Sequence, residues 1–241
     1  MHLYIIRHAQ STNNALTDQR QRVKDPPLTE LGHLQAKAVA QHLTSGVNLE
    51  QRVGVSEEDT TIRARRGYKI THLYCSAMYR ALQTAQPISE ALELVPAVWP
   101  DIHEHGGIFL DHEDERGTVG YPGMTRAEIL AEFPNYYLPA EIGEAGWWHD
   151  GREDWPDCYA RAIRVAIELR KRADNDDYIA IVTHGGFIDS LLKALTNQLP
   201  TRGVYYHHFN TALTHVEFYT SGHISIRYIN RVPHLPADLV S

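Results

Sequence analysis

Three short apolar runs, each followed closely by polar residues, most constrain the fold of this chain. The first is Leu3-Tyr-Ile-Ile6, the second extends from Ile70 to Cys75, and the third is Tyr178-Ile-Ala-Ile-Val-Thr183. The first and third show no alternation of polar and apolar side chains. Such continuous runs are typical of strands that are buried on both faces, as in a parallel sheet covered by helices.

Between and after these runs, apolar residues recur at the three- and four-residue spacing of a helix face. Thr29 is a suitable N-cap for the first helix, and Glu30 follows it in the first turn, where the helix dipole favours a carboxylate. Near the chain end, apolar residues alternate on both sides of a turn at Thr220, which predicts a β-hairpin. The order predicts an α/β fold: a three-layer α/β/α sandwich with a mostly parallel central sheet and a C-terminal β-hairpin. The expected helix faces lie within residues 36–43, 81–92, 159–166 and 191–195.

We expect the 241 residues to form a single domain, 1–241, with two excursions. Residues 46–69 are polar and charged, and they predict a surface insertion. Residues from about 100 to 155 are rich in Gly, Pro, aromatic and acidic residues, and they predict an irregular acidic cap insertion, here called the cap segment. Trp147, Trp148 and Trp155 are expected to pack this segment onto the core.

Composition and charge exclude several classes of protein. The chain has two cysteines, which is too few for a disulfide scaffold or a Cys-rich zinc module. No apolar run is long enough to cross a membrane, and the N-terminus resembles a strand rather than a signal peptide, so we expect a cytoplasmic protein with no membrane partner. Residues 81–160 carry 16 acidic and 3 basic side chains, which argues against nucleic acid as a partner.

Polar residues stand just past the predicted strands, where ligands bind in open α/β sheets. Arg7 and His8 follow the first strand, Arg80 comes shortly after the second, and His184 follows the third. If these strands are parallel neighbours, the four side chains meet in one crevice. Two guanidinium groups match the oxygens of a phosphate, and a neutral histidine between them can attack phosphorus. The sequence therefore predicts a small-molecule phosphate substrate.

Four segments carry the most specific patterns in the chain, and they occur in order along it. They are Arg7-His8-Ala9-Gln10-Ser11-Thr12-Asn13-Asn14, Pro27-Leu28-Thr29-Glu30-Leu31-Gly32-His33-Leu34-Gln35-Ala36, Ser76-Ala77-Met78-Tyr79-Arg80-Ala81-Leu82-Gln83-Thr84-Ala85 and Val182-Thr183-His184-Gly185-Gly186. Together they resemble the motifs of the histidine phosphatase superfamily, which includes cofactor-dependent phosphoglycerate mutases. The resemblance extends from residue 3 to about residue 235, which is nearly the whole chain.

The resemblance implies a role for each matched residue. His8 would accept the phosphoryl group and form a phosphohistidine. Arg7, Arg80 and His184 would bind the phosphoryl group, with Asn14 and Ser11 assisting. Glu104 stands where the family carries its acid/base glutamate, in the loosest of the matches, and Asp101 and Glu113 are its alternatives. The cap segment would cover the site, and neither a metal nor an organic cofactor would be needed.

Two residues depart from the family pattern. Ala9 replaces the usual glycine, so a positive φ there would cost energy, although its carbonyl is still available to accept a hydrogen bond from His8. Gln10 replaces the usual glutamate, which removes a negative charge near the phosphate.

The first functional hypothesis is a histidine phosphatase, which is a phosphomonoester hydrolase acting through a phosphohistidine on a small monophosphate. The alternatives are a mutase of the phosphoglycerate mutase type, a non-catalytic phosphate-binding module and a metallophosphatase. The metal hypothesis comes from the 15 histidines, which include the pairs His103/His105 and His207/His208. None of the familiar metal-ligand motifs is present, and we expect the paired histidines to lie at the surface. The sequence leaves a homo-oligomer open.

Overall fold

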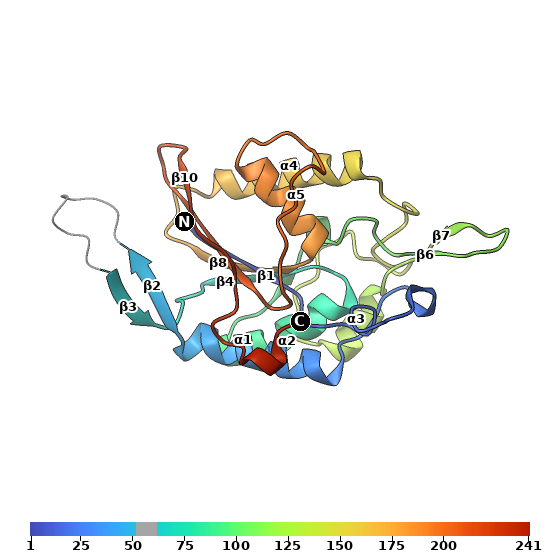
Figure 1. The fold of residues 1–241 in the computed structure, drawn as a ribbon, viewed down its shortest axis with the longest axis horizontal. Coiled ribbons are helices and arrows are strands. Elements are labelled where there is room, and N and C mark those ends of the chain that lie inside the picture. Colours follow the sequence, from blue (N-terminus) through green and yellow to red (C-terminus); the bar gives the residue numbers. More distant parts are fainter. Residues whose placement is uncertain (52–61) are drawn as a thin grey trace.

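The computed structural model describes residues 1–51 and 62–241, and its centre is a six-stranded sheet (Figure 1). The strand order is β10-β9-β1-β8-β4-β5. Within this order, β1, β8, β4 and β5 run parallel to one another. Strands β9 and β10 form an antiparallel hairpin at the edge next to β1. The strands are β1 (His2–Arg7), β4 (His72–Cys75), β5 (Ala97–Val98), β8 (Tyr178–Thr183), β9 (Leu213–Phe218) and β10 (Ile224–Arg231).

Helices cover both faces of this sheet, which confirms the predicted three-layer sandwich (Figure 1). Leu3 and Ile5 of β1 pack with α4 and α5 in one cluster, and Tyr4 and Ile6 pack with α1 and α2 in the other. All four side chains are fully buried. A polar side chain at any of these positions would have no contact with water, whichever face of the sheet it lay on. The helices are α1 (Glu30–Ser45), α2 (Tyr79–Leu92), α4 (Trp155–Lys171) and α5 (Gly185–Leu195).

The predicted surface insertion begins and ends as a two-stranded antiparallel ribbon, β2 (Val47–Gln51) and β3 (Ile62–Arg66). Residues 52–61 of that insertion lie outside the described residues. Its end is not at the surface, because Tyr68 is buried and its ring meets the Tyr4 ring edge-on at a centroid distance of 5.2 Å.

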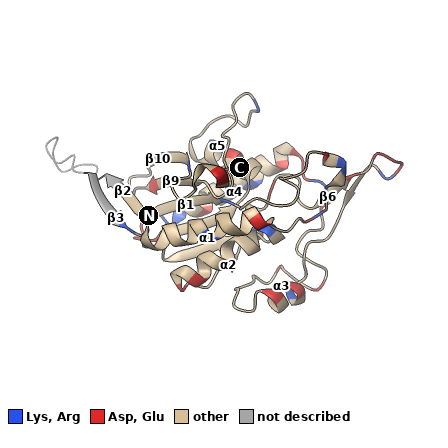
Figure 2. Cartoon of the chain, turned by 60° about the horizontal axis from the view of Figure 1, so that its bottom comes forward, with Lys and Arg blue, Asp and Glu red and all other residues tan. Residues whose placement is uncertain are grey.

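The cap segment holds the ribbon β6 (Phe109–Asp111) and β7 (Thr118–Gly120) and the short helix α3 (Arg126–Glu132). Ile129, Phe133, Trp147 and Trp148 are buried in the same apolar cluster as α1 and α2. Its acidic residues, by contrast, are spread along α3 and the loops beside β6 (Figure 2). Apolar packing therefore joins the cap segment to the sandwich, while many of its carboxylates face water.

Three single turns of 3-10 helix complete the secondary structure of the described residues: Gln19–Gln21, Pro100–Ile102 and Ala237–Leu239. Within residues 1–51 and 62–241, no helix is both long and apolar enough to span a membrane.

The N-terminus of α1 depends on Thr29, as the sequence predicts. The Thr29 Oγ1 accepts a hydrogen bond from the Gly32 N–H at 3.0 Å and donates to the Gln10 Oε1 at 2.7 Å. Because Thr29→Ala removes both bonds, we expect it to lower the free energy of unfolding by about 1–2 kcal/mol in urea denaturation. Thr44→Ala, at the exposed other end of α1, should change it by less than about 0.5 kcal/mol. Equal effects of the two substitutions would contradict this account of the cap.

Candidate active site

The ends of three adjacent parallel strands bring the predicted polar residues together. Strand β8 lies between β1 and β4 in the sheet, and the three strands run in the same direction. The rings of His8 and His184 lie 5.0 Å apart between centroids. The Arg80 Nε donates to the His8 Nε2 at 3.2 Å. Two imidazoles and a guanidinium that are distant in the sequence therefore share one crevice, together with Arg7 at the end of β1.

The contacts of His8 determine which of its ring nitrogens carries the proton. The Nδ1 lies 2.6 Å from the carbonyl oxygen of Ala9, which can only accept, so the proton is on Nδ1. The Nε2 accepts from the Arg80 Nε and is therefore unprotonated. This is the tautomer that a nucleophilic histidine requires.

Burial and positive neighbours keep both histidines neutral. Burial is the largest cause that lowers the pKa of His8 well below its usual value, and the Arg80 and Arg7 charges lower it further. The pKa of His184 is lowered in the same way, first by burial and then by Arg80 and His8. At neutral pH, the lone pair of His8 is therefore not blocked by a proton.

Some of the polar atoms in this crevice have no hydrogen-bond partner among residues 1–51 and 62–241. The Arg7 Nη1 donates to the carbonyl of His208, but the buried Arg7 Nε has no acceptor in the described part of the chain. Neither ring nitrogen of His184 has a hydrogen-bond partner there. Buried polar groups are normally paired, so unpaired cationic and imidazole donors beside His8 fit an anion with several oxygens.

Glu104 reaches the same crevice from the cap segment and binds the N-terminus of α5. Its Oε1 accepts from the N–H groups of Phe187 at 3.0 Å and His105 at 2.9 Å, and its Oε2 accepts from Gly186 at 3.3 Å. These bonds satisfy N–H groups that have no partner within a helix. The alternatives, Asp101 and Glu113, are exposed, so Glu104 is the one of the three candidates that the fold holds at this site.

Ser11 and Asn14 bind each other in the loop after His8. The backbone N–H and the hydroxyl of Ser11 both donate to the Asn14 Oδ1, at 3.1 and 3.0 Å. Ser11 is buried and Asn14 is exposed. Their contacts shape the loop, and their assistance in phosphate binding stays a prediction.

Comparison with known proteins agrees with this geometry. The family model of the histidine phosphatase superfamily (branch 1) matches residues 3–56 and 51–231. The chain belongs to the histidine phosphatase superfamily.

Solved structures with the same fold include proteins named as phosphatases. A mycobacterial glucosyl-3-phosphoglycerate phosphatase complexed with VO3 is 22% identical over 96% of this chain and 99% of its own, with a TM-score of 0.57. A phosphoserine phosphatase from Entamoeba histolytica, complexed with 3-phosphoglyceric acid, is 18% identical over 98% and 99%, with a TM-score of 0.58. Bacillus stearothermophilus YhfR is 19% identical over 97% and 98%, also with a TM-score of 0.58.

At these identities, the likeness to solved structures shows the fold. No match was found among curated protein sequences. The superfamily and its named neighbours support a phosphatase activity for this chain.

The two departures from the family motif are accommodated locally. Ala9 is not among the residues with a positive φ, so the replacement of glycine costs no backbone strain there. The side chain of Gln10 points to Thr29, whose hydroxyl donates to its Oε1 at 2.7 Å. In this structure, Gln10 thus holds the N-terminus of α1.

The expectation that paired histidines lie at the surface is wrong for two of them. His103 and His208 are buried, and each hydrogen-bonds a backbone carbonyl through Nδ1. Among the residues that the structure describes, no three His, Cys, Asp or Glu side chains lie close enough to hold a metal ion.

Asp25 and Tyr205 are site residues that the sequence analysis missed. Asp25 lies 3.7 Å from the Arg80 Nη1 and accepts the backbone N–H of Tyr79 at the start of α2. The Tyr205 hydroxyl lies beside Arg7 at the start of α5. A Cβ atom built on Gly185 would be 3.6 Å from this hydroxyl and 3.5 Å from the Arg7 Nε. Asp25 directly precedes Pro26, in the stretch that resembles the family, but nothing local pairs it with an arginine 55 residues away.

A cavity of about 500 Å³ opens beside Asp25 and Tyr79, between the loop before α1 and the cap segment. Four carboxyl side chains and one lysine line it: Asp25, Glu128, Glu132, Glu144 and Lys24. It is large enough for the alcohol part of a small substrate.

The charge of Asp25 gives a pH-dependent prediction. Burial raises its pKa to about 6, although Arg80 opposes the rise. Near pH 7 the carboxylate offsets part of the Arg80 charge, so Asp25→Asn should bind inorganic phosphate severalfold more tightly by calorimetry. Near pH 5 the wild-type carboxyl is mostly protonated, so the two proteins should bind alike.

Asp174→Asn is the matched control, because Asp174 is exposed in the turn that follows α4. It should leave phosphate affinity unchanged at both pH values. A gain for Asp25→Asn that is as large near pH 5 as near pH 7 would contradict the assigned charge state.

Proposed function

We propose that this protein hydrolyses small phosphate monoesters through a phosphohistidine at His8. The observation that carries the proposal is the unprotonated Nε2 of His8, next to Arg80 and His184 in a buried crevice. Hydrolysis needs a nucleophile, cationic groups around the phosphoryl oxygens and an acid near the leaving oxygen. His8, the two arginines and Glu104 supply these three parts.

In the first half of the reaction, the His8 Nε2 attacks phosphorus and the bond to the alcohol oxygen breaks. The proton stays on the His8 Nδ1, which donates to the carbonyl of Ala9 and so holds the ring in place. Arg7, Arg80 and His184 bind the phosphoryl oxygens as charge shifts toward the leaving group. Protonated Glu104 donates its proton to that oxygen, so the product leaves as a neutral alcohol.

In the second half, the Glu104 carboxylate takes a proton from water as the water attacks the phosphohistidine. The bond between phosphorus and the His8 Nε2 breaks, its electron pair returns to the ring, and inorganic phosphate leaves. Glu104 is protonated again and His8 is neutral, so the cycle closes without a cofactor.

The substrate that we propose is a monophosphate with little additional negative charge. The cavity beside Asp25 is lined by four carboxyl groups and only one lysine. Carboxylates there disfavour a second anionic group on the alcohol, which a phosphoglycerate would bring. The proposal includes no nucleic acid or membrane partner.

Replacing the nucleophile tests the reaction. In the presence of a chelator, the wild-type protein should hydrolyse 4-nitrophenyl phosphate, and His8→Ala should lower kcat by at least about 10⁴-fold. Acid-labile, alkali-stable phosphate should be trapped on the wild-type protein after quenching and be absent from the variant. His223→Ala, an exposed position in the β9–β10 turn, should behave like the wild type.

Other outcomes would favour the other hypotheses. Loss of wild-type activity in chelator would indicate a metallophosphatase. Isomerisation of a phosphoglycerate without phosphate release would indicate a mutase. Phosphate binding without turnover of aryl phosphate, phosphoserine or phosphoglycerates would indicate a binding module. Sedimentation of the same preparation would reveal whether the protein forms a homo-oligomer.

A further inference from the structure

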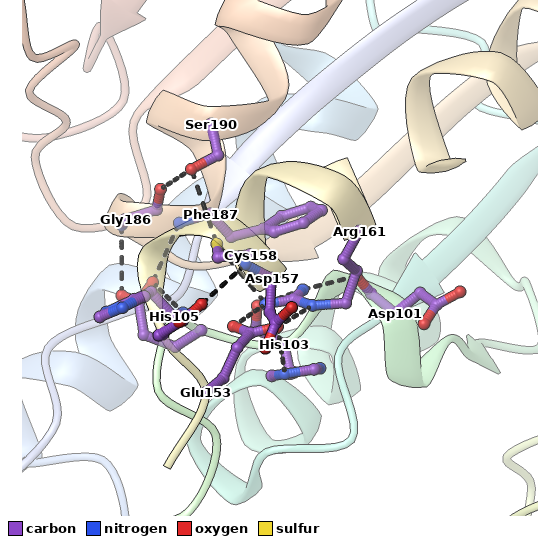
Figure 3. A network of polar contacts seen from close by, with 12 residues as sticks. Asp101, His103, His105, Glu153, Asp157, Cys158, Arg161, Gly186, Phe187 and Ser190 are labelled. Atoms are coloured by element: carbon purple, nitrogen blue, oxygen red, sulfur yellow. Dashed lines mark hydrogen bonds and ion pairs between the residues drawn. The ribbon is translucent and has the colours of Figure 1, made fainter. Parts of the chain in front are cut away.

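A buried arginine on α4 binds the backbone that leads into Glu104 (Figure 3). Arg161 is 3% exposed. Its Nη1 donates to the carbonyl oxygens of Asp101 at 2.7 Å and His103 at 3.0 Å. These two carbonyls stand in the three residues just before Glu104, so the guanidinium sets the path of the chain into the acid.

The other N–H groups of the Arg161 guanidinium also have hydrogen-bond acceptors. Its Nε and Nη2 bind the two carboxylate oxygens of Glu153 at 2.7 and 2.6 Å, and its Nη2 also lies 3.7 Å from the Cys158 sulfur. All five N–H donors thus have an acceptor. The planar fork fixes its partners in one geometry, which a lysine could not do.

Two further contacts connect this network to the groups that hold Glu104. The hydroxyl of Thr183, next to His184, donates to the carbonyl of Ile102 at 2.6 Å. The Arg161 guanidinium lies over the ring of Phe187, whose backbone N–H binds the Glu104 carboxylate. Glu104 is therefore held through its backbone from one side and through its carboxylate from the other.

A buried ion pair is a poor source of stability, because desolvation of both charges offsets most of their attraction. A pair of apolar residues could fill the same space. A role in stability therefore does not explain why every Arg161 N–H group has an acceptor. A role in fixing the position of the chain before Glu104 does. We propose that Arg161, held by Glu153, is a positioning residue that keeps Glu104 at the leaving oxygen. This inference rests on the proposed function of Glu104 as the acid.

The dependence on the leaving group separates this role from a merely structural one. A general acid matters for an alcohol, whose alkoxide is a strong base, and matters little for nitrophenolate, which leaves without help. The ratio kcat/KM reports the steps through the first departure of the leaving group. Displacement of Glu104 should therefore harm an alkyl phosphate selectively, whereas damage to folding or phosphate binding would harm both esters equally.

The experiment compares glycerol 2-phosphate with 4-nitrophenyl phosphate. The double variant Arg161→Met/Glu153→Leu removes both buried charges, so neither is left unpaired. We expect its kcat/KM to fall about 100-fold on the alkyl ester and less than about fivefold on the aryl ester. Glu104→Gln should show the same selective loss. Arg164→Met, exposed on the same helix, should match the wild type on both esters.

Arg161→Lys provides a second variant that keeps the charge opposite Glu153. Its three N–H donors cannot cover both carbonyls and both carboxylate oxygens, so the alkyl ester alone should lose about 10-fold in kcat/KM. If the Arg161 variants lost kcat/KM equally on the two esters while Glu104→Gln lost it only on the alkyl ester, the positioning role of Arg161 would be wrong. The proposed function would still stand. Failure of the wild type to hydrolyse either ester would overturn the proposed function as well.

Discussion

A neutral imidazole buried between two arginines is the interaction on which the other features of this site depend. His8 lies in a crevice where desolvation and the charges of Arg80 and Arg7 all lower its pKa. The cost of burying the two guanidinium groups is offset in part by Asp25 and Glu104, which raise the pKa of Arg80 against the effect of burial. A phosphoryl group that enters the crevice meets cations already in place, so little reorganisation is needed as charge develops.

The parallel sheet makes this arrangement possible. Parallel neighbours expose their carboxyl ends at the same edge, so β1 and β8 deliver His8 and His184 side by side. The start of α5 then serves two purposes, because His184 stands at its N-cap position while Glu104 binds the N–H groups that His184 leaves unpaired. The helix needs an acceptor and the acid needs fixed donors, so one set of bonds satisfies both.

Local patterns predicted the strands β1, β4, β8, β9 and β10, the helices α1, α2, α4 and α5 and the residues at their ends, because burial periodicity and capping depend on near neighbours. They did not predict β5, the two short ribbons or α3. Thr29 is the clearest instance, since its hydroxyl caps α1 as expected. The roles of Asp25 and Arg161 could not be predicted in this way. Asp25 pairs with Arg80, 55 residues further along the chain, and Arg161 binds backbone carbonyls 58 and 60 residues before it. No local pattern in a single sequence indicates such distant partners. The sequence also could not show whether Ala9 adopts a positive φ, because this depends on the backbone conformation.

The charge of the whole chain is a poor guide to the substrate, although the cap segment is strongly acidic. Asp114 and Asp111 are exposed on the β6–β7 ribbon, and each pairs with an arginine, Arg116 or Arg152. Exposed charges are screened by salt within about 10 Å, so these carboxylates have little effect on a buried phosphoryl group. The field at His8 is set instead by the half-buried Arg7 and Arg80 with their carboxylate neighbours. In the proposed function, discrimination between substrates comes from the groups that line the cavity beside Asp25, which pairs with Arg80.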